Sequence, residues 1–124
     1  MPHYVSQLMM EMFCMGPDCE SAILIRQTAT NGALILRIKR DNDWIKEMLY
    51  WLARFHDDFV RSGKPPPPNF FWNSTDSAER TRYHQFLERT KQIESNADVL
   101  DHIPNRKIQR VVGESSRAMD LFLD

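Results

Sequence analysis

Four consecutive prolines, Pro65–Pro68, constrain this 124-residue chain more than any other feature of its sequence. Proline fixes the backbone angle φ and has no N–H donor, so the run cannot continue a helix or lie inside a sheet. It favours an extended polyproline II segment instead. We therefore expect a proline-rich linker over residues 63–69, between a compact unit at 1–62 and a second segment at 70–124. We interpret the prolines as a structural strut, with a ligand for an SH3-type domain as the alternative.

The residues before the prolines begin with the pattern of a helix and a β-hairpin. Apolar residues at helical spacing predict a helix over residues 3–15. Two strands rich in isoleucine and leucine follow within residues 22–38, and Asn31-Gly32 between them supplies residues that favour a tight turn. In the second strand one face is apolar, while the other becomes basic toward its end.

Two longer helices are expected on either side of the prolines. Asp41 or Asp43 can cap the first of them, which runs to about Arg61 and carries a wide apolar and aromatic stripe. After the prolines, the aromatic residues Phe70–Trp72 are expected to anchor the chain. The second helix starts after a cap at residues 74–76 and runs to about Asn96.

The end of the chain has a weaker pattern, in which short helical stretches are expected near residues 97–102 and 114–122. The predicted fold class is therefore α/β (α+β): helix, hairpin and long helix in 1–62, followed by a helical appendage over 70–124. The hairpin is expected to stand as two strands with exposed edges, which is a marginal arrangement.

Composition and charge restrict the classes of function. The net charge is −1, so contact with nucleic acid would need a local basic patch, such as Arg37, Lys39 and Arg40 or the cluster at residues 106–110. Two cysteines do not make a disulfide framework, and the chain shows no zinc-ligand spacing. Without an apolar stretch of membrane-spanning length or a signal peptide, we expect an intracellular protein, cytoplasmic or nuclear, that is neither secreted nor membrane-bound.

An ordered set of motifs in residues 2–62 carries a resemblance to a known family. A Tyr-x-x-Gln helix with Tyr4 and Gln7 precedes the hairpin, and Arg40-Asp41 stands between the hairpin and the next helix. This order resembles the C-terminal part of the YqaJ-like viral recombinase family, the lambda-type exonucleases. The resemblance does not extend to residues 70–124.

The resemblance implies a restriction-endonuclease-like core and a magnesium-dependent exonuclease that digests linear duplex DNA. The family signature for metal binding is an Asp and a Glu-x-Lys on adjacent strands, which lie upstream of the Tyr-x-x-Gln helix. We expect no complete metal site here, and so a fragment or degenerate relative that is inactive alone. Gln7 is then expected to support a catalytic site, and Tyr4, Arg37, Lys39 and Arg40 are candidate DNA contacts.

A non-enzymatic module is the alternative hypothesis. The chain is then a protein-interaction or DNA-binding accessory module, and a protein partner would bind through Pro65–Pro68 and Phe70–Trp72. Exposure of the aromatic residues 70–72 favours this hypothesis, whereas their burial against the helix at residues 44–59 counts against it.

Overall fold

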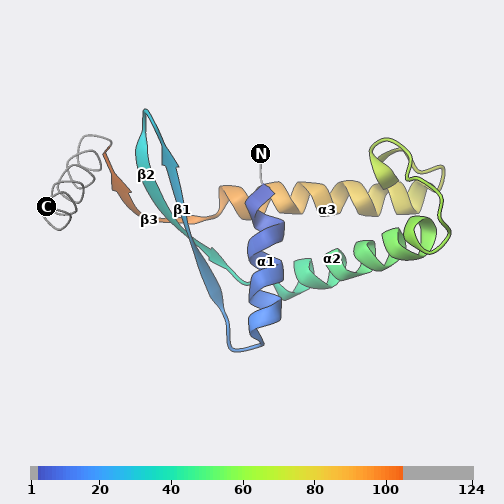
Figure 1. The fold of residues 1–124 in the computed structure, drawn as a ribbon, viewed down its shortest axis with the longest axis horizontal. Coiled ribbons are helices and arrows are strands. Elements are labelled where there is room, and N and C mark those ends of the chain that lie inside the picture. The colour runs from blue at the N-terminus through green and yellow to red at the C-terminus, as the bar shows by residue number, and fades with distance from the viewer. Residues whose placement is uncertain (1–2, 105–124) are drawn as a thin grey trace, which may run out of the picture. The chain divides into compact units, whose positions relative to one another are not determined.

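The computed structural model describes residues 3–104 and shows a mixed fold of helices and one antiparallel sheet (Figure 1). The elements in chain order are α1 (His3–Met15), β1 (Ser21–Thr28), β2 (Gly32–Lys39), α2 (Asn42–Phe55), a π-helical turn (His56–Val60), a 3-10 turn (Phe70–Asn73), α3 (Ser77–Ser95) and β3 (Asp98–Ile103). They form two compact units: a helical unit of residues 3–22 and 39–96, and a sheet unit of residues 23–38 and 97–104. The α+β class is confirmed. No helix in the described part of the chain is long and apolar enough to cross a membrane.

The helical unit is built on α2 and α3, which lie side by side and are both contacted by α1 (Figure 1). The predicted stripe of α2 forms its core, with Trp44, Ile45, Met48 and Trp51 all buried. α1 adds methionines to this core. Met9 and Met12 are buried, because their flexible side chains fill the space against the other helices.

Both long helices start at the predicted caps. Asp41 accepts a hydrogen bond from the Trp44 N–H at 3.0 Å, and Asp76 accepts from Ala78 and Glu79. These carboxylates satisfy N–H groups that have no partner within the helix. At its other end α2 changes into the π-helical turn before Gly63, whose positive φ of 72° ends the helical path.

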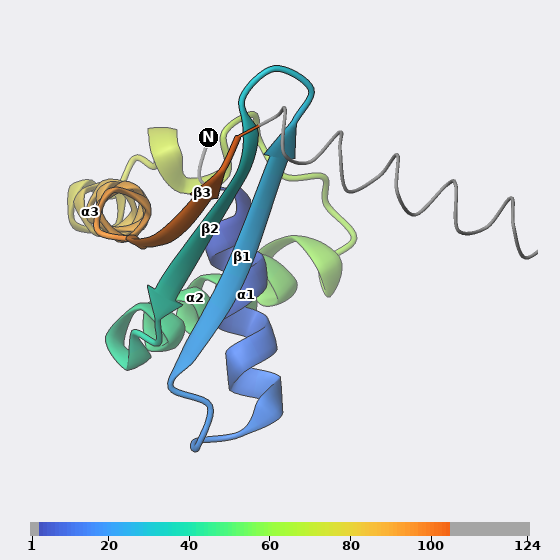
Figure 2. The ribbon, with the colours of Figure 1, turned by 90° about the vertical axis from the view of Figure 1, so that its left-hand side faces the viewer.

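The sheet unit has three strands in the order β1-β2-β3 (Figure 2). The hairpin of β1 and β2 is confirmed, and Gly32 at its turn has a positive φ of 76°. The short helix expected near residues 97–102 is wrong, because this segment is the strand β3, which pairs antiparallel with β2. Its β-branched residues suit a strand, and pairing satisfies the backbone groups of the β2 edge. The second short helix, near 114–122, lies outside the described residues.

The segment after the prolines contributes to both units. It supplies α3, which contacts α1 and α2, and β3, which completes the sheet. This grouping differs from the expected division into residues 1–62, 63–69 and 70–124. Because β3 pairs with β2, the hairpin is part of a three-stranded sheet and does not stand as two strands. The difference arises because both elements join partners that precede the prolines in sequence. α3 packs Phe86 and Tyr83 against Trp44 and Trp51 of α2. β3 joins the sheet through backbone pairing with β2, while its Val99 and Leu100 remain exposed.

Candidate functional site

Gln7 and Tyr4 lie on α1, where the resemblance places a site-supporting pair. The Gln7 amide Nε2 donates a hydrogen bond to Glu11 Oε1 at 3.1 Å, one helical turn further on, and both side chains are exposed. Tyr4 is half-buried. No group of three or more His, Cys, Asp or Glu side chains that could hold a metal ion occurs in residues 3–104. These residues therefore do not form a site that fits magnesium.

Arg40 connects the end of α1 to the start of α2. Its Nη1 donates to the backbone carbonyls of Met12 (2.9 Å), Gly16 (2.8 Å) and Cys19 (3.2 Å), and its Nε donates to Asn42. Three of these acceptors are carbonyls at or beyond the C-terminus of α1, where a helix leaves its own carbonyls unpaired. The placement of this side chain thus follows from the fold, and its predicted contact with DNA stays a prediction.

Asp41, the second member of the Arg-Asp pair, links α2 to α3. Besides capping α2, its carboxylate accepts hydrogen bonds from the Arg89 guanidinium at 2.8 to 3.2 Å. Arg37 and Lys39 are exposed on β2, and Arg37 belongs to the sheet unit. Contacts of these two side chains with DNA also stay predictions.

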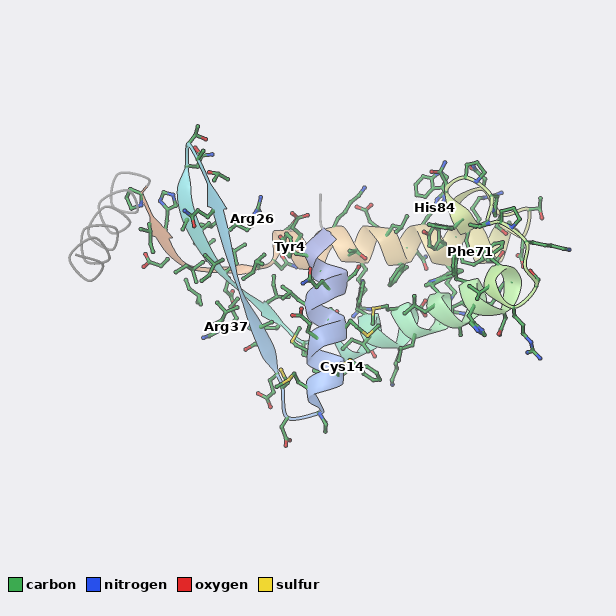
Figure 3. All side chains as sticks on the ribbon, viewed as in Figure 1. Tyr4, Cys14, Arg26, Arg37, Phe71 and His84 are labelled. Carbon is green, nitrogen blue, oxygen red and sulfur yellow. The ribbon has the colours of Figure 1, made fainter. Side chains whose placement is uncertain are left out.

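The proline loop, residues 61–73, joins α2 to α3 at the end of the helical unit away from Tyr4 (Figure 3). Every residue from Arg61 to Phe70 is exposed, including all four prolines. The loop closes in a tight turn, in which the Phe70 N–H donates to the Pro67 carbonyl at 3.1 Å. Asn69 and Phe70 have positive φ values of 63° and 48°, an unfavourable conformation for such residues that persists only where the surroundings hold it.

Phe71 fixes the loop to the helices. It is 7% exposed, and its ring lies 4.8 Å from Trp51, 5.9 Å from Phe59 and 5.7 Å from Tyr83, measured between centroids. Burial in this cluster also raises the pKa of Tyr83 above its usual value. An aromatic cluster of this kind contributes more to stability than its buried area alone. It holds the loop on α2 and α3.

The two aromatic residues beside Phe71 remain partly exposed. Phe70 packs edge-on against Phe55 and is 44% exposed. Trp72 stacks on His84 with 3.7 Å between ring centroids and is 42% exposed. Burial of Phe71 counts against the hypothesis of an aromatic contact surface, whereas exposure of its two neighbours favours it.

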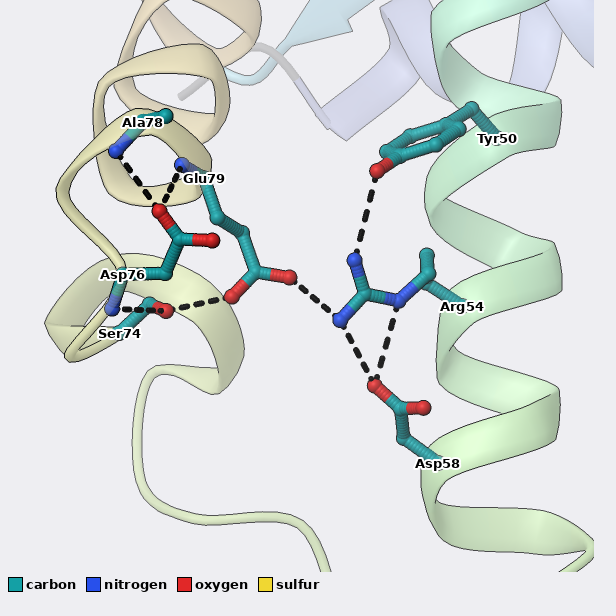
Figure 4. A network of polar contacts seen from close by, with 7 residues as sticks. All are labelled: Tyr50, Arg54, Asp58, Ser74, Asp76, Ala78 and Glu79. Atoms are coloured by element: carbon teal, nitrogen blue, oxygen red, sulfur yellow. Dashed lines mark hydrogen bonds and ion pairs between the residues drawn. The ribbon is translucent and has the colours of Figure 1, made fainter.

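A polar network closes the base of the loop (Figure 4). Arg54 of α2 donates to Tyr50 and Asp58 and forms an ion pair with Glu79 of α3. Glu79 in turn accepts a hydrogen bond from Ser74 Oγ. The hydrogen bond with Tyr50, together with Asp58 and Glu79, raises the pKa of Arg54 above its already high usual value. The guanidinium therefore stays charged and ties the residues before the loop to those after it.

A second arginine braces α2 against α3. Arg82 donates to both carboxylate oxygens of Glu47, at 2.8 and 3.1 Å, and its guanidinium lies 3.6 Å from the centre of the Tyr50 ring. The hydrogen bond with Glu47 raises the pKa of Arg82. Stacking on an aromatic face adds a cation–π attraction to the ion pair. The helices that carry the loop are thus held by two arginine contacts that the sequence did not predict.

The chain matches no family model, no curated protein and no solved structure. The geometry is therefore the basis for any functional conclusion. Within residues 3–104 it brings together an exposed proline run, two half-exposed aromatic rings and a base held by the Arg54 network and the Phe71 cluster.

Proposed function

We propose that this chain is a non-enzymatic protein-interaction module that presents the proline loop to a partner. The observation that carries the proposal is the full exposure of Pro65–Pro68, while Phe71 and the Arg54 network fix the loop on α2 and α3. Here the anchoring stabilises a segment whose own side chains contribute little to the core.

The partner that fits this loop is a domain with an aromatic-lined groove for polyproline II segments. Each residue from Lys64 to Pro67 precedes a proline, which disfavours the helical conformation and favours the extended one. A segment that is already extended loses little conformational entropy on binding. Lys64 adds a positive charge at one end, and Phe70 and Trp72 add exposed apolar area at the other.

The test is a titration of the isotope-labelled chain with three representative proline-binding domains, an SH3, a WW and an EVH1 domain, followed by NMR. A polyproline II helix has three residues per turn, so Pro65 and Pro68 share one edge. We expect at least one domain to bind, and the double substitution P65A/P68A to weaken binding by roughly tenfold, about 1.4 kcal/mol.

Pro66→Ala is the matched control, because Pro66 lies on a different edge of the same segment. We expect its affinity to stay within about threefold of the original chain. Both variants should keep the thermal midpoint of the parent, since all three prolines are exposed. The absence of any shift with all three domains at roughly 1 mM would refute the proposal.

A relationship to the lambda-type exonucleases is a second proposal, supported by the order of elements. α1 with Tyr4 and Gln7, the β1–β2 hairpin, Arg40-Asp41 and α2 follow one another as in the resemblance. The restriction-endonuclease-like core and the role of Gln7 belong to this proposal. Magnesium and duplex DNA are the cofactor and substrate that such ancestry implies for a complete family member.

We predict that the chain with magnesium does not degrade linear duplex DNA. The reason is that no cluster of metal-binding side chains is present among the described residues, and Gln7 is hydrogen-bonded to Glu11. The measurement is a gel assay of end-labelled DNA over a range of protein concentrations. Robust degradation that the substitution Glu11→Gln abolishes would contradict the prediction.

A further inference from the structure

Among residues 3–104, no strand pairs with the outer edge of β1. Within the described residues β1 and β3 are the two edge strands of the sheet, and β1 is eight residues long. Ile23 and Ile25 lie on one face of it and are 57% and 63% exposed. An exposed, apolar edge strand is a template for pairing with another strand.

The other edge of the sheet is protected in ways that proteins commonly use. β3 carries two exposed acids, Asp98 and Asp101, and its pairing with β2 shifts register between Ile35 and Leu36. Charges and irregular pairing both discourage addition of a further strand. β1 contains no proline, lysine or acidic residue. The contrast identifies β1 as the edge that can accept a strand.

Successive residues of β1 direct their backbone N–H and C=O groups alternately toward β2 and away from it, so the alternation shows which groups can pair with a further strand. The Arg40 N–H donates to the Glu20 carbonyl at 2.8 Å, so even-numbered residues of this stretch direct their backbone groups toward β2. The even-numbered Arg26 and Thr28 also line one pocket together with Leu34 of β2, so their side chains share one face of the sheet. The odd-numbered Ile23 and Ile25 therefore direct their N–H and C=O groups to the open edge.

We infer that a second copy of this chain pairs with β1 antiparallel, about a two-fold axis at Leu24. In this register Ile23 of each copy lies opposite Ile25 of the other, and pairs of β-branched residues stabilise a sheet. A shift by two residues places an isoleucine opposite Ser21 or Gln27 instead.

The charge on the edge also fits a second copy. Arg26 is the one charged residue of β1, and in this register it lies opposite Ala22 and away from the other Arg26. Pairing through β3 would bring the acids of two copies together. The two-fold contact uses both β1 edges and leaves the protected β3 edges outside, so assembly stops at the dimer.

The first test is the molar mass of the whole chain, measured by light scattering and sedimentation from about 1 to 500 µM. We expect a reversible dimer. Ile25→Pro removes an outward N–H but leaves the hydrogen bonds to β2 intact, and it should raise the dissociation constant at least tenfold. Ile25→Val keeps the N–H and the branched side chain, so it should remain a dimer.

A second variant tests the register and does not depend on the proline substitution. In a background with Cys14→Ser and Cys19→Ser, Leu24→Cys should form an intermolecular disulfide, because the two β-carbons face each other across the axis. Ala22→Cys should not form one. A monomer at all concentrations, open-ended polymers, or equal cross-linking at both positions would overturn the inference. Its failure would leave the proline loop unaffected, because no β1 residue belongs to that loop.

Discussion

Replacing Trp44 by alanine should lower the free energy of unfolding by about 4 kcal/mol, the range observed when large aromatic side chains are removed from protein cores. Trp44 is fully buried, and its indole stacks on Phe86 with 5.1 Å between ring centroids. Its Nε1 also donates to Thr90 Oγ1 at 2.8 Å. The substitution removes the contact that joins α2 to the middle of α3. Because a domain has about 5–15 kcal/mol of stability, roughly a quarter to four-fifths of it would be lost.

The measurement is urea unfolding followed by circular dichroism, and Trp72→Ala is the matched control. Trp72 carries the same side chain on the surface, where it is 42% exposed and stacks on His84. We expect the control to change the free energy of unfolding by less than about 1 kcal/mol. Equal effects of the two substitutions would mean that the α2–α3 contact is not the core of the protein.

The contribution of the Trp44 hydrogen bond to stability can be measured separately from the contribution of its packing. Trp44→Phe keeps an aromatic ring and removes the N–H, and Thr90 retains a bond in which its hydroxyl donates to the Phe86 carbonyl at 2.8 Å.

The sequence predicted that Trp44 lies on a buried stripe because the spacing of apolar residues is a local property. It did not predict Thr90 as the partner, because a threonine within a polar helix carries no sign of a contact 46 residues away.

The same division between local and distant information applies to the rest of the fold. The caps at Asp41 and Asp76 and the turn at Gly32 were predictable, because each depends on residues within a few positions. β3 was not, since six residues after a helix carry too short a pattern to identify a strand. Its identity depends on the edge of β2, whose paired residues lie 61 to 70 positions earlier in the chain.

The candidate site was predictable only in its composition. The sequence identified Pro65–Pro68 and Phe70–Trp72, but it gave no means of deciding which of the three aromatic residues is buried. The structure places Phe71 inward and its neighbours outward, and it adds Arg54 as the residue that closes the base of the loop. Arg54 and Glu79 are 25 positions apart, so their ion pair has no local signature.

Arg40→Met should lower the free energy of unfolding by about 3 kcal/mol, because a hydrogen bond to a charged group contributes about 1.5–3 kcal/mol and water can replace part of the loss. Methionine fills a similar volume but donates no hydrogen bond. The carbonyls of Met12, Gly16 and Cys19 would then lose their shared donor, and the turn after α1 would loosen. Urea unfolding measures the change, and hydrogen exchange at residues 13–20 localises it.

Arg37→Met is the control for Arg40→Met, because both arginines are candidate DNA contacts but only Arg40 holds the end of α1. Arg37 is exposed on β2, so we expect its substitution to change the free energy of unfolding by less than about 0.5 kcal/mol. Salt-dependent binding to duplex DNA, measured on the same two variants, separates the roles. If Arg40→Met leaves stability unchanged but weakens DNA binding, the hydrogen bonds of Arg40 to the end of α1 do not stabilise the fold. The relationship to DNA-degrading enzymes then gains support. If stability falls and binding to DNA is absent in the parent chain, Arg40 serves the fold alone.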